Sequence, residues 1–449
     1  MQTNALIQPM QSDGQPSPKR VPPSVFRPIQ YLGNKLRSVA AITEVAQNLV
    51  KPNARILDLF TGSSVVSQSF AHLGFQVTAV DSQMYSQVLA SALLGINRAN
   101  HDTLSWNVIL ELLERITAKC QISEWDPYIA EENAALASDD YERLIVLYAD
   151  LPLIWRATNS KSQDGGHLQV IGKPLITMLQ AGIYFGVKQS LALDAIRLAI
   201  ELAYARRSIS LWARHAALTA LMSAMSSAVH SAGKHFAQPL SAGASTNYPF
   251  LRTRMLQDRR IDITEAFVER CAIINRMAEP SDRGHSSFQG LAEDFLGSSS
   301  STFELVYADP PYTAQQYSRF YHLLETLVLY KMPDLYHKGR VTIGLYPTNR
   351  FKSAFCSKRF APDAFGKLIC AARQKSAHLL ISYSRSTIAS NGNSRMISME
   401  DLLSLCRKEF GRQHVECVPL SHTYRQFNSQ ERSNSERSDP EILIVCAQR

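Results

Sequence analysis

The sequence contains few cysteines, and none of them forms a C-x-x-C pair. The seven cysteines among 449 residues are scattered along the chain, at Cys120, Cys271, Cys356, Cys370, Cys406, Cys417 and Cys446. A zinc site or a disulfide framework requires thiols at close, regular spacing. We therefore expect no metal site and predict that these cysteines are buried or free thiols.

Long hydrophobic runs are also missing from the chain. No apolar stretch reaches the about 18 residues that are needed to span a bilayer. The first 25 residues are polar and include five prolines, without the apolar core of an export signal. We predict that residues 1–25 form a disordered tail and that the protein is a cytoplasmic enzyme with no membrane partner.

The G-x-G-x-x-G fingerprint of dinucleotide-binding folds is absent as well, although a related pattern is present. The apolar segment Arg55–Leu59 leads into Phe60–Ser64, and a helical pattern and a second apolar segment ending at Asp81 follow. This order predicts a β-loop-α-β unit. Gly62 permits close approach of a ligand, and Asp81, 19 residues later, is placed to meet ribose hydroxyls. The missing fingerprint favours a nucleoside without phosphates.

A second strand-to-loop transition carries the chemistry. The apolar segment Phe303–Ala308 leads directly into Asp309-Pro310-Pro311-Tyr312. Two prolines fix the backbone, so the Asp309 carboxylate and the Pro310 carbonyl can accept hydrogen bonds from a planar amine. Tyr312 can stack on the base that carries this amine. A duplex hides such an atom, so the base must be flipped out. A strand ending in a plain Pro-Pro turn would have the same local sequence.

Four segments together resemble the adenine-specific DNA methyltransferases of the D12 class, which includes the Dam-type enzymes. They are Gln30–Lys35, Asp58–Ser63, Glu293–Phe295 and Asp309–Tyr312, in this order. The resemblance implies S-adenosylmethionine as the cofactor and N6 of adenine as the methylated atom. It assigns cofactor binding to Tyr31, Lys35, Asp58, Phe60, Gly62, Ser63, Asp81, Asp294 and Phe295, and catalysis to Asp309, Pro310, Pro311 and Tyr312. Ser64 departs from the family pattern, which has glycine there.

The same resemblance sets the expected domain organisation. Residues 26–101 and 291–449 are predicted to form an α/β catalytic domain with a mixed, Rossmann-like sheet typical of S-adenosylmethionine-dependent methyltransferases. Residues 102–290 are predicted to be an inserted, mainly helical target-recognition domain. Apolar periodicity predicts helices at 102–120 and 128–147, with a break at Asp126-Pro127. Residues 187–229 are predicted to form one long helix or two consecutive helices.

Positive charge favours a polyanionic partner, because the net charge is +8 and the pI is near 9.1. The segment 331–359 has seven basic residues and one acidic residue, interleaved with aromatics. Its Arg340, Arg350 and Lys352 are predicted to bind phosphates, although a solvated basic loop is the alternative. A Gly/Ser/Ala-rich loop at 231–254 is predicted to read bases through Lys234, Arg252 and Arg254, unless it is a disordered connector.

Several features after the Asp309–Tyr312 motif lead to weaker predictions. The helix that follows it is expected to place His322 and Glu325 in or near the cleft. Residues 415–420 and 441–446 are expected to form a closing hairpin. The long turn between these two strands carries Arg425, Arg432 and Arg437, which form either a phosphate clamp or a flexible tip.

The predicted function is site-specific methylation of adenine N6 in double-stranded DNA, in restriction-modification or phage defence. A cognate restriction nuclease or a defence-system protein is the expected partner. The acceptor geometry also suits RNA adenine or the exocyclic amine of cytosine, so these remain alternatives. A non-catalytic DNA-recognition subunit with the same fold is the alternative from another functional class.

Overall fold

The computed structural model describes residues 25–33, 35–95, 106–119, 124–157, 174–240, 249–277, 283–337, 340–342, 344–384, 394–420 and 441–448. Almost all of the predicted tail lies outside these ranges. So do residues 241–248 of the predicted recognition loop, and Arg425, Arg432 and Arg437 of the turn after residue 420.

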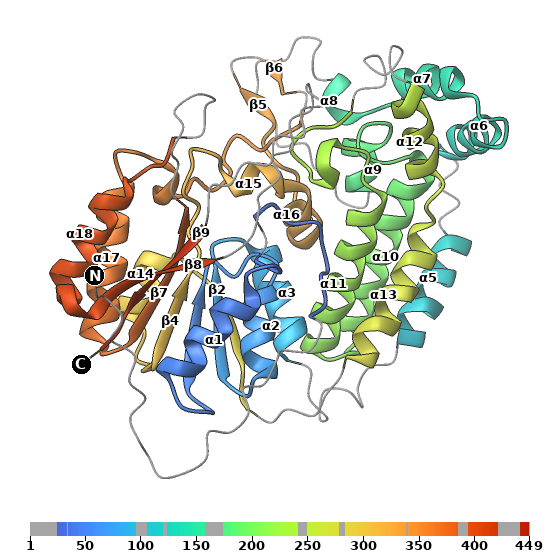
Figure 1. Cartoon of the computed structure of the whole chain (residues 1–449). Coiled ribbons are helices and arrows are strands. Elements are labelled where there is room, and N and C mark those ends of the chain that lie inside the picture. The colour runs from blue at the N-terminus through green and yellow to red at the C-terminus, as the bar shows by residue number, and fades with distance from the viewer. Residues whose placement is uncertain are drawn as a thin grey trace.

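A seven-stranded sheet, in the order β3-β2-β1-β4-β7-β9-β8, forms the centre of one half of the molecule (Figure 1). Its strands are β1 (Arg55–Leu59), β2 (Gln76–Asp81), β3 (Ser286–Gln289), β4 (Leu305–Ala308), β7 (His378–Ser384), β8 (Val415–Leu420) and β9 (Glu441–Cys446). Neighbouring strands are parallel except at β9, which is antiparallel to both β7 and β8. The predicted α/β class and the closing hairpin are therefore confirmed, and the sheet is consistent with the methyltransferase fold.

Helices cover both faces of this sheet (Figure 1). On one face lie α1 (Val39–Leu49), α2 (Val65–His72) and α3 (Met84–Leu94), and on the other lie α14 (Ala292–Ser298), α17 (Ala361–Gln374) and α18 (Met399–Phe410). Successive strand residues alternate between the two buried cores, since side chains along a strand point to opposite faces. In β1, for example, Ile56 packs with α1 and α2, whereas Leu57 and Leu59 pack on the other side.

The segment between α3 and β3 is mainly helical. Its helices are α5 (Trp106–Lys119), α6 (Asp126–Ala137), α7 (Tyr141–Asp150), α8 (Ile154–Ala157), α9 (Leu175–Gln180), α10 (Val187–Ala205), α11 (Leu211–Ala228), α12 (Pro249–Arg259) and α13 (Ile263–Arg276). Two separate helices lie on either side of the break predicted at Asp126-Pro127, since α5 ends at Lys119 and α6 begins at Asp126, with the proline in its first turn. The single helix predicted at 128–147 is wrong, because the chain breaks again before α7, which Asp140 caps through a hydrogen bond from the Arg143 N–H.

Two further differences concern the end of this segment. The loop predicted through residue 254 is wrong from Pro249 onward, because Pro249 begins α12. Strand β3 was not anticipated, and it pairs in parallel with β2 at the edge of the main sheet. Its sequence, Ser-Ser-Phe-Gln, is short and polar, so hydrophobic periodicity gave no signal for it.

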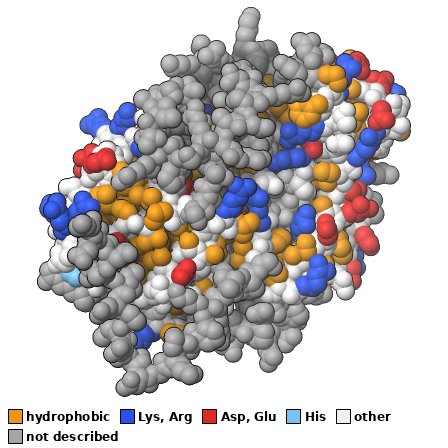
Figure 2. Space-filling view, in the orientation of Figure 1, with side chains coloured by type: hydrophobic (Ala, Val, Ile, Leu, Met, Phe, Trp, Pro, Cys, Tyr) orange, Lys and Arg blue, Asp and Glu red, His pale blue; other side chains and the backbone are white. Residues whose placement is uncertain are grey.

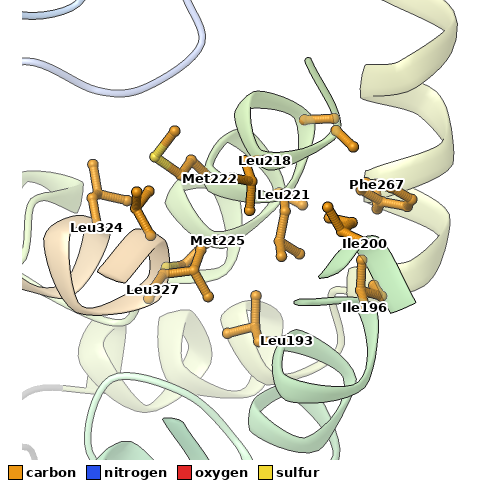
Figure 3. Close-up of a cluster of buried hydrophobic side chains, with 14 of the residues drawn as sticks. Leu193, Ile196, Ile200, Leu218, Leu221, Met222, Met225, Phe267, Leu324 and Leu327 are labelled. Atoms are coloured by element: carbon orange, nitrogen blue, oxygen red, sulfur yellow. The ribbon is translucent and has the colours of Figure 1, made fainter. Parts of the chain in front are cut away.

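The helical segment shares one buried core with the sheet half. Side chains from α10, α11 and α13 pack against α3 and against α16 (His322–Leu329), the helix that follows the Asp309–Tyr312 loop. Figure 3 shows this core, with Leu324 and Leu327 of α16 facing Met222 and Met225 of α11. The remaining elements, α15 (Tyr317–Phe320), β5 (Tyr336–His337) and β6 (Arg340–Val341), lie beyond the carboxyl ends of the strands (Figure 1). Among the described residues, no helix is long and apolar enough to cross a membrane.

Candidate active site

The predicted site residues follow three adjacent parallel strands. β1 lies between β2 and β4, with Asp58 beside Ala79 on one side and beside Tyr307 on the other. The loops after these strands therefore meet at one edge of the sheet. The chain progresses outward from β1 through β2 to β3 and then crosses to β4, so this edge is a topological switch point, where ligands bind in open α/β sheets.

A cavity opens at this edge, with about 810 Å³ of empty space including the part open to solvent. Eight of the predicted residues line it: Tyr31, Lys35, Phe60, Asp81, Asp309, Pro310, Pro311 and Tyr312. The cavity thus brings together the Asp81 region and the Asp309–Tyr312 motif, although more than 200 residues separate them in the sequence.

Asp81 is fixed by backbone donors. Its two carboxylate oxygens accept hydrogen bonds from the N–H groups of Gly62 and Gln83, each at 2.9 Å. Burial raises the pKa of this carboxyl group, and the backbone donors oppose the rise. A carboxylate has about four lone-pair sites, so this group is of a type that can also accept hydrogen bonds from ribose hydroxyls.

The loop between β1 and α2 has a tightly constrained backbone. Phe60, Gly62 and Ser64 all have positive φ angles, of 65°, 55° and 63°. A Cβ atom on Gly62 would lie 2.8 Å from the ring of Tyr31, so this position requires glycine. Ser64 occupies the place of the family's second glycine and keeps the left-handed conformation that glycine adopts freely. Its buried hydroxyl has no hydrogen-bond partner among the described residues.

Asp58 and Ser63 lie behind the loop and do not line the cavity. Both side chains are buried, and Asp58 accepts a hydrogen bond from the hydroxyl of Ser67. Burial raises the pKa of Asp58 to about 8, so its carboxyl group is mostly neutral near pH 7. This arrangement makes Asp58 a support for the loop in the structure, rather than a direct ligand contact.

The acidic element after β3 presents a different residue from the predicted one. Asp294 is exposed and does not line the cavity, whereas Glu293, one position earlier on α14, does. Burial raises the pKa of Glu293. Phe295 packs on Phe288 of β3, with the ring centroids 5.5 Å apart. Adjacent residues on a helix point about 100° apart, so Glu293 faces the cavity and Asp294 does not.

Lys35 joins two carboxylates in the catalytic corner. Its ammonium lies 2.9 Å from Asp309 Oδ1 and 3.1 Å from Glu441 Oε1, and the Lys35 side chain is 4% exposed. Burial opposes its charge, but the two carboxylates raise the pKa of Lys35 well above its usual value. Burial raises the pKa of Asp309 to about 6; Lys35 opposes this rise, and Glu441 adds to it. The three groups together carry one excess negative charge when ionised.

Glu441 also fixes Tyr312. The Tyr312 hydroxyl donates to Glu441 Oε1 at 3.1 Å, and the guanidinium of Arg395 lies over the Tyr312 ring at 4.8 Å. Glu441 is the first residue of β9, so the antiparallel pairing of β9 with β7 delivers its side chain to the site. The sequence prediction missed this residue, and nothing local to Glu441 distinguishes it from any strand-initial carboxylate.

His322 and Glu325, which were predicted in or near the cleft, do not line the cavity, although Glu325 bonds to the backbone of Tyr85, which does. His322 is 2% exposed and its Nε2 donates to the Phe236 carbonyl at 3.0 Å. Burial lowers its pKa to about 3, which keeps the imidazole neutral. Glu325 accepts from the N–H groups of Met84 and Tyr85, at 3.1 and 2.9 Å, and thereby caps the start of α3.

The predicted base-reading residues of the helical segment form internal contacts. Lys234 and Arg254 both pair with Asp258, and Arg252 pairs with Glu142. None of the three lines the cavity. Lys352 is exposed and Arg350 is half-buried near the cavity rim, whereas the side chain of Arg340 lies outside the described part of the structure.

Three known methyltransferases are similar in sequence to parts of this chain. No protein-family profile matches the chain. The type II methyltransferase M.FokI of Planomicrobium okeanokoites is 24% identical over 79% of this chain and 44% of its own length. The type II methyltransferase M.NlaIII of Neisseria lactamica is 32% identical over 25% of this chain and 31% of its own length. The modification methylase LlaI of Lactococcus lactis subsp. lactis is 34% identical over 23% of this chain and 14% of its own length. The chain therefore spans less than half the length of each of these relatives, and along most of its own length it is similar to a type II methyltransferase.

Proposed function

We propose that this protein transfers a methyl group from S-adenosylmethionine to the N6 amine of adenine in double-stranded DNA. The single observation that carries this proposal is the cavity in which Asp81 and the Asp309–Tyr312 motif face each other across β1. The names of the relatives, two type II methyltransferases and one modification methylase, support methylation of DNA within restriction-modification. A cognate nuclease is then the natural partner.

The residues on the β2 side fit the adenosyl part of the donor. Asp81 would accept hydrogen bonds from the ribose hydroxyls, and Val80, Leu291 and Ala292 would supply apolar walls. Glu293 lies on the same side as an acceptor for the adenine amine of the donor. When bound, S-adenosylmethionine supplies an electrophilic methyl group on a sulfonium.

The residues on the β4 side fit the acceptor base. Asp309 and the Pro310 carbonyl would each accept a hydrogen bond from the N6 amine, which makes its lone pair more available for attack. The nitrogen becomes cationic as the new N–C bond forms and the S–C bond breaks. The excess negative charge of Asp309, Glu441 and Lys35 stabilises this cation, and the extra proton then leaves to water or to Asp309. Tyr312, held by Glu441, would stack on the flipped base.

In this proposal the helical segment flanks the DNA and contributes to target recognition. Its predicted limits, residues 102–290, are too wide at the carboxyl end, because β3 belongs to the main sheet. A recognition part would therefore end before Ser286.

Incubation with a radiolabelled methyl donor tests the proposal directly. The purified protein is mixed with unmodified duplex DNA, with RNA or with no nucleic acid, and the products are digested to nucleosides. We expect label in N6-methyladenine from DNA alone, and none with Asp309→Ala. Label in N4-methylcytosine or in RNA would overturn the substrate, and donor binding without transfer would support the non-catalytic DNA-recognition subunit.

A further inference from the structure

Two arginines that are adjacent in sequence to cavity-lining residues have no carboxylate to neutralise them among the described residues. Arg319 lies in α15 and Arg350 in the segment after β6, and neither has an acidic partner within the described part of the chain. The Nε atoms of both guanidiniums are buried and have no hydrogen-bond partner there. Unpaired buried donors of this kind are costly, which indicates that an anion completes them.

Hydrogen bonds between the two segments hold these arginines close to the cavity. Ser318 donates to the Phe351 carbonyl at 2.5 Å, and both residues line the cavity. The Gln316 side chain accepts from the Ser353 N–H at 2.8 Å. Arg319 and Arg350 are the immediate sequence neighbours of Ser318 and Phe351, so these bonds fix the backbone of both arginines next to the cavity wall, although neither arginine lines the cavity itself.

Aromatic and backbone contacts further restrict the two side chains. The Arg319 guanidinium lies 5.1 Å from the centroid of Phe320 and 5.7 Å from that of Tyr346. Arg350 donates through Nη1 to the Pro347 carbonyl at 2.9 Å. Burial lowers the pKa of Arg350, and the nearby positive charge of Arg319 lowers it further. Two positive charges near each other at a half-buried place repel, and a bound anion would relieve this repulsion.

We propose that Arg319 and Arg350 form a clamp for one backbone phosphate of the DNA strand that carries the everted base. This inference rests on the proposed function and identifies which side chains hold the strand. A flipped nucleotide stays connected to its two flanking phosphates, so these must remain at the mouth of the cavity. Guanidinium forks suit phosphate oxygens, and each such contact contributes to the salt dependence of binding. On the face shown in Figure 2, lysine and arginine side chains also gather near the middle, between the two halves.

Binding of duplex DNA as a function of salt tests the clamp without requiring turnover. The double substitution Arg319→Gln/Arg350→Gln should reduce the slope of log affinity against log salt by about 0.9, the value for one phosphate, and each single substitution should reduce it by part of that amount. Arg319→Lys should keep the slope but bind more weakly, because lysine lacks the fork. Arg276→Gln, an exposed substitution on α13, is the matched control and should change neither quantity. Donor binding measured by calorimetry should be the same in all variants, which shows that they are folded.

A phosphate scan identifies the contact itself. Duplexes carrying one neutral methylphosphonate at each position around the methylated adenine are titrated with wild type and with Arg319→Gln. The double variant Arg319→Gln/Arg350→Gln is titrated in the same way. At one position flanking the adenine, the wild type should lose about as much affinity as the double variant loses on native DNA, and the double variant should lose nothing more. Additive losses at every position would overturn the clamp.

The two proposals fail in different ways. Unchanged salt slopes in both arginine variants, with methyl transfer intact in the wild type, would overturn the clamp and leave the methyltransferase proposal standing. A reduced slope together with a wild type that transfers no methyl group would sustain the clamp and overturn the methyltransferase proposal.

Discussion

At the scale of single residues, the chemistry depends on the charge balance around Asp309. Lys35 holds Asp309 and Glu441 together in a buried cluster, and Glu441 also fixes Tyr312. One carboxylate beside one ammonium would be neutral; the second carboxylate leaves a negative charge where the amine becomes cationic. The excess negative charge of this cluster also makes the protonation of Asp309 sensitive to its neighbours.

We expect methyl transfer to fall as the pH drops below about 6. The pKa of Asp309 is raised to about 6, so the ionised, hydrogen-bond-accepting form is present above this pH and is lost below it. Single-turnover rates measured from about pH 5 to 9 give the profile, with saturating donor at each pH. An acid limb near pH 4, the ordinary carboxyl range, would contradict this interpretation.

Glu441→Gln should move the same acid limb to lower pH. Glu441 raises the pKa of Asp309, so its removal lets that pKa fall, while the glutamine keeps an acceptor for Tyr312. The plateau rate should fall by roughly 10- to 100-fold, because the cluster loses its excess negative charge. A reduced plateau with an unmoved acid limb would mean that Glu441 acts only through the position of Tyr312.

Gly62→Ala should weaken binding of the methyl donor. The added Cβ would meet the Tyr31 ring at 2.8 Å, and φ is +55°, where an L side chain is strained. A cost of about 1–3 kcal/mol corresponds to roughly 5- to 150-fold weaker binding by calorimetry. Gly297→Ala on α14 is the control, since no atom lies within 4 Å of its added Cβ. Equal donor affinities in both variants would disprove the close approach at Gly62.

At the scale of elements, charged side chains from one helix complete the ends of another. Arg197 of α10 donates to the carbonyls of Leu327 and Val328, at 2.8 and 2.9 Å, and so caps the C-terminus of α16. Glu325 of α16 in turn caps α3. Helix termini leave backbone groups without intrahelical partners, so these contacts link the helical segment to the catalytic loop through α16.

Arg197→Met should lower the free energy of unfolding by about 2–4 kcal/mol, because two buried carbonyls and the partner Glu201 lose a charged donor. Urea denaturation measures the change. Arg206→Met, which replaces an exposed arginine just after α10, should stay within about 0.5 kcal/mol of wild type. Similar losses in the two variants would show that the capping contacts do not matter.

At the scale of the whole molecule, the helical segment and the sheet half are one packed body. The core in Figure 3 runs from α16, beside the catalytic loop, through α11 and α10 to Phe267 of α13. A contiguous core couples the stability of its parts, because a void on one side removes contacts from both. The four tryptophans, at positions 106, 125, 155 and 212, all lie in the helical segment and report on it selectively.

Leu324→Ala should therefore destabilise both halves together. Leu324 is fully buried on α16, and its truncation should cost about 2–5 kcal/mol. The urea midpoint from tryptophan fluorescence and the midpoint from loss of donor binding should shift by the same amount. Leu329→Ala on the same helix is the control, since Leu329 is 43% exposed. If the urea midpoint from donor binding shifted and the midpoint from fluorescence did not, the two halves would unfold independently.

Much of the fold was accessible to prediction because its signals are local. Apolar segments that lead to Asp81 and Asp309 mark the buried parallel strands β2 and β4. Strand β3 and helix α12 were missed because their sequences are polar, and tertiary pairing or packing rather than periodicity establishes them.

The sequence alone determined the two loops that carry the chemistry, since glycine at 62 and the consecutive prolines after Asp309 restrict the backbone by local sterics. Only the tertiary structure decided which distant residues complete the site around these two loops. Lys35 and Glu441 are 406 residues apart and meet because β9 inserts beside β7. Glu293 rather than Asp294 faces the cavity because of a helical rotation. Contacts of this kind depend on how distant elements pack, and no local pattern encodes them.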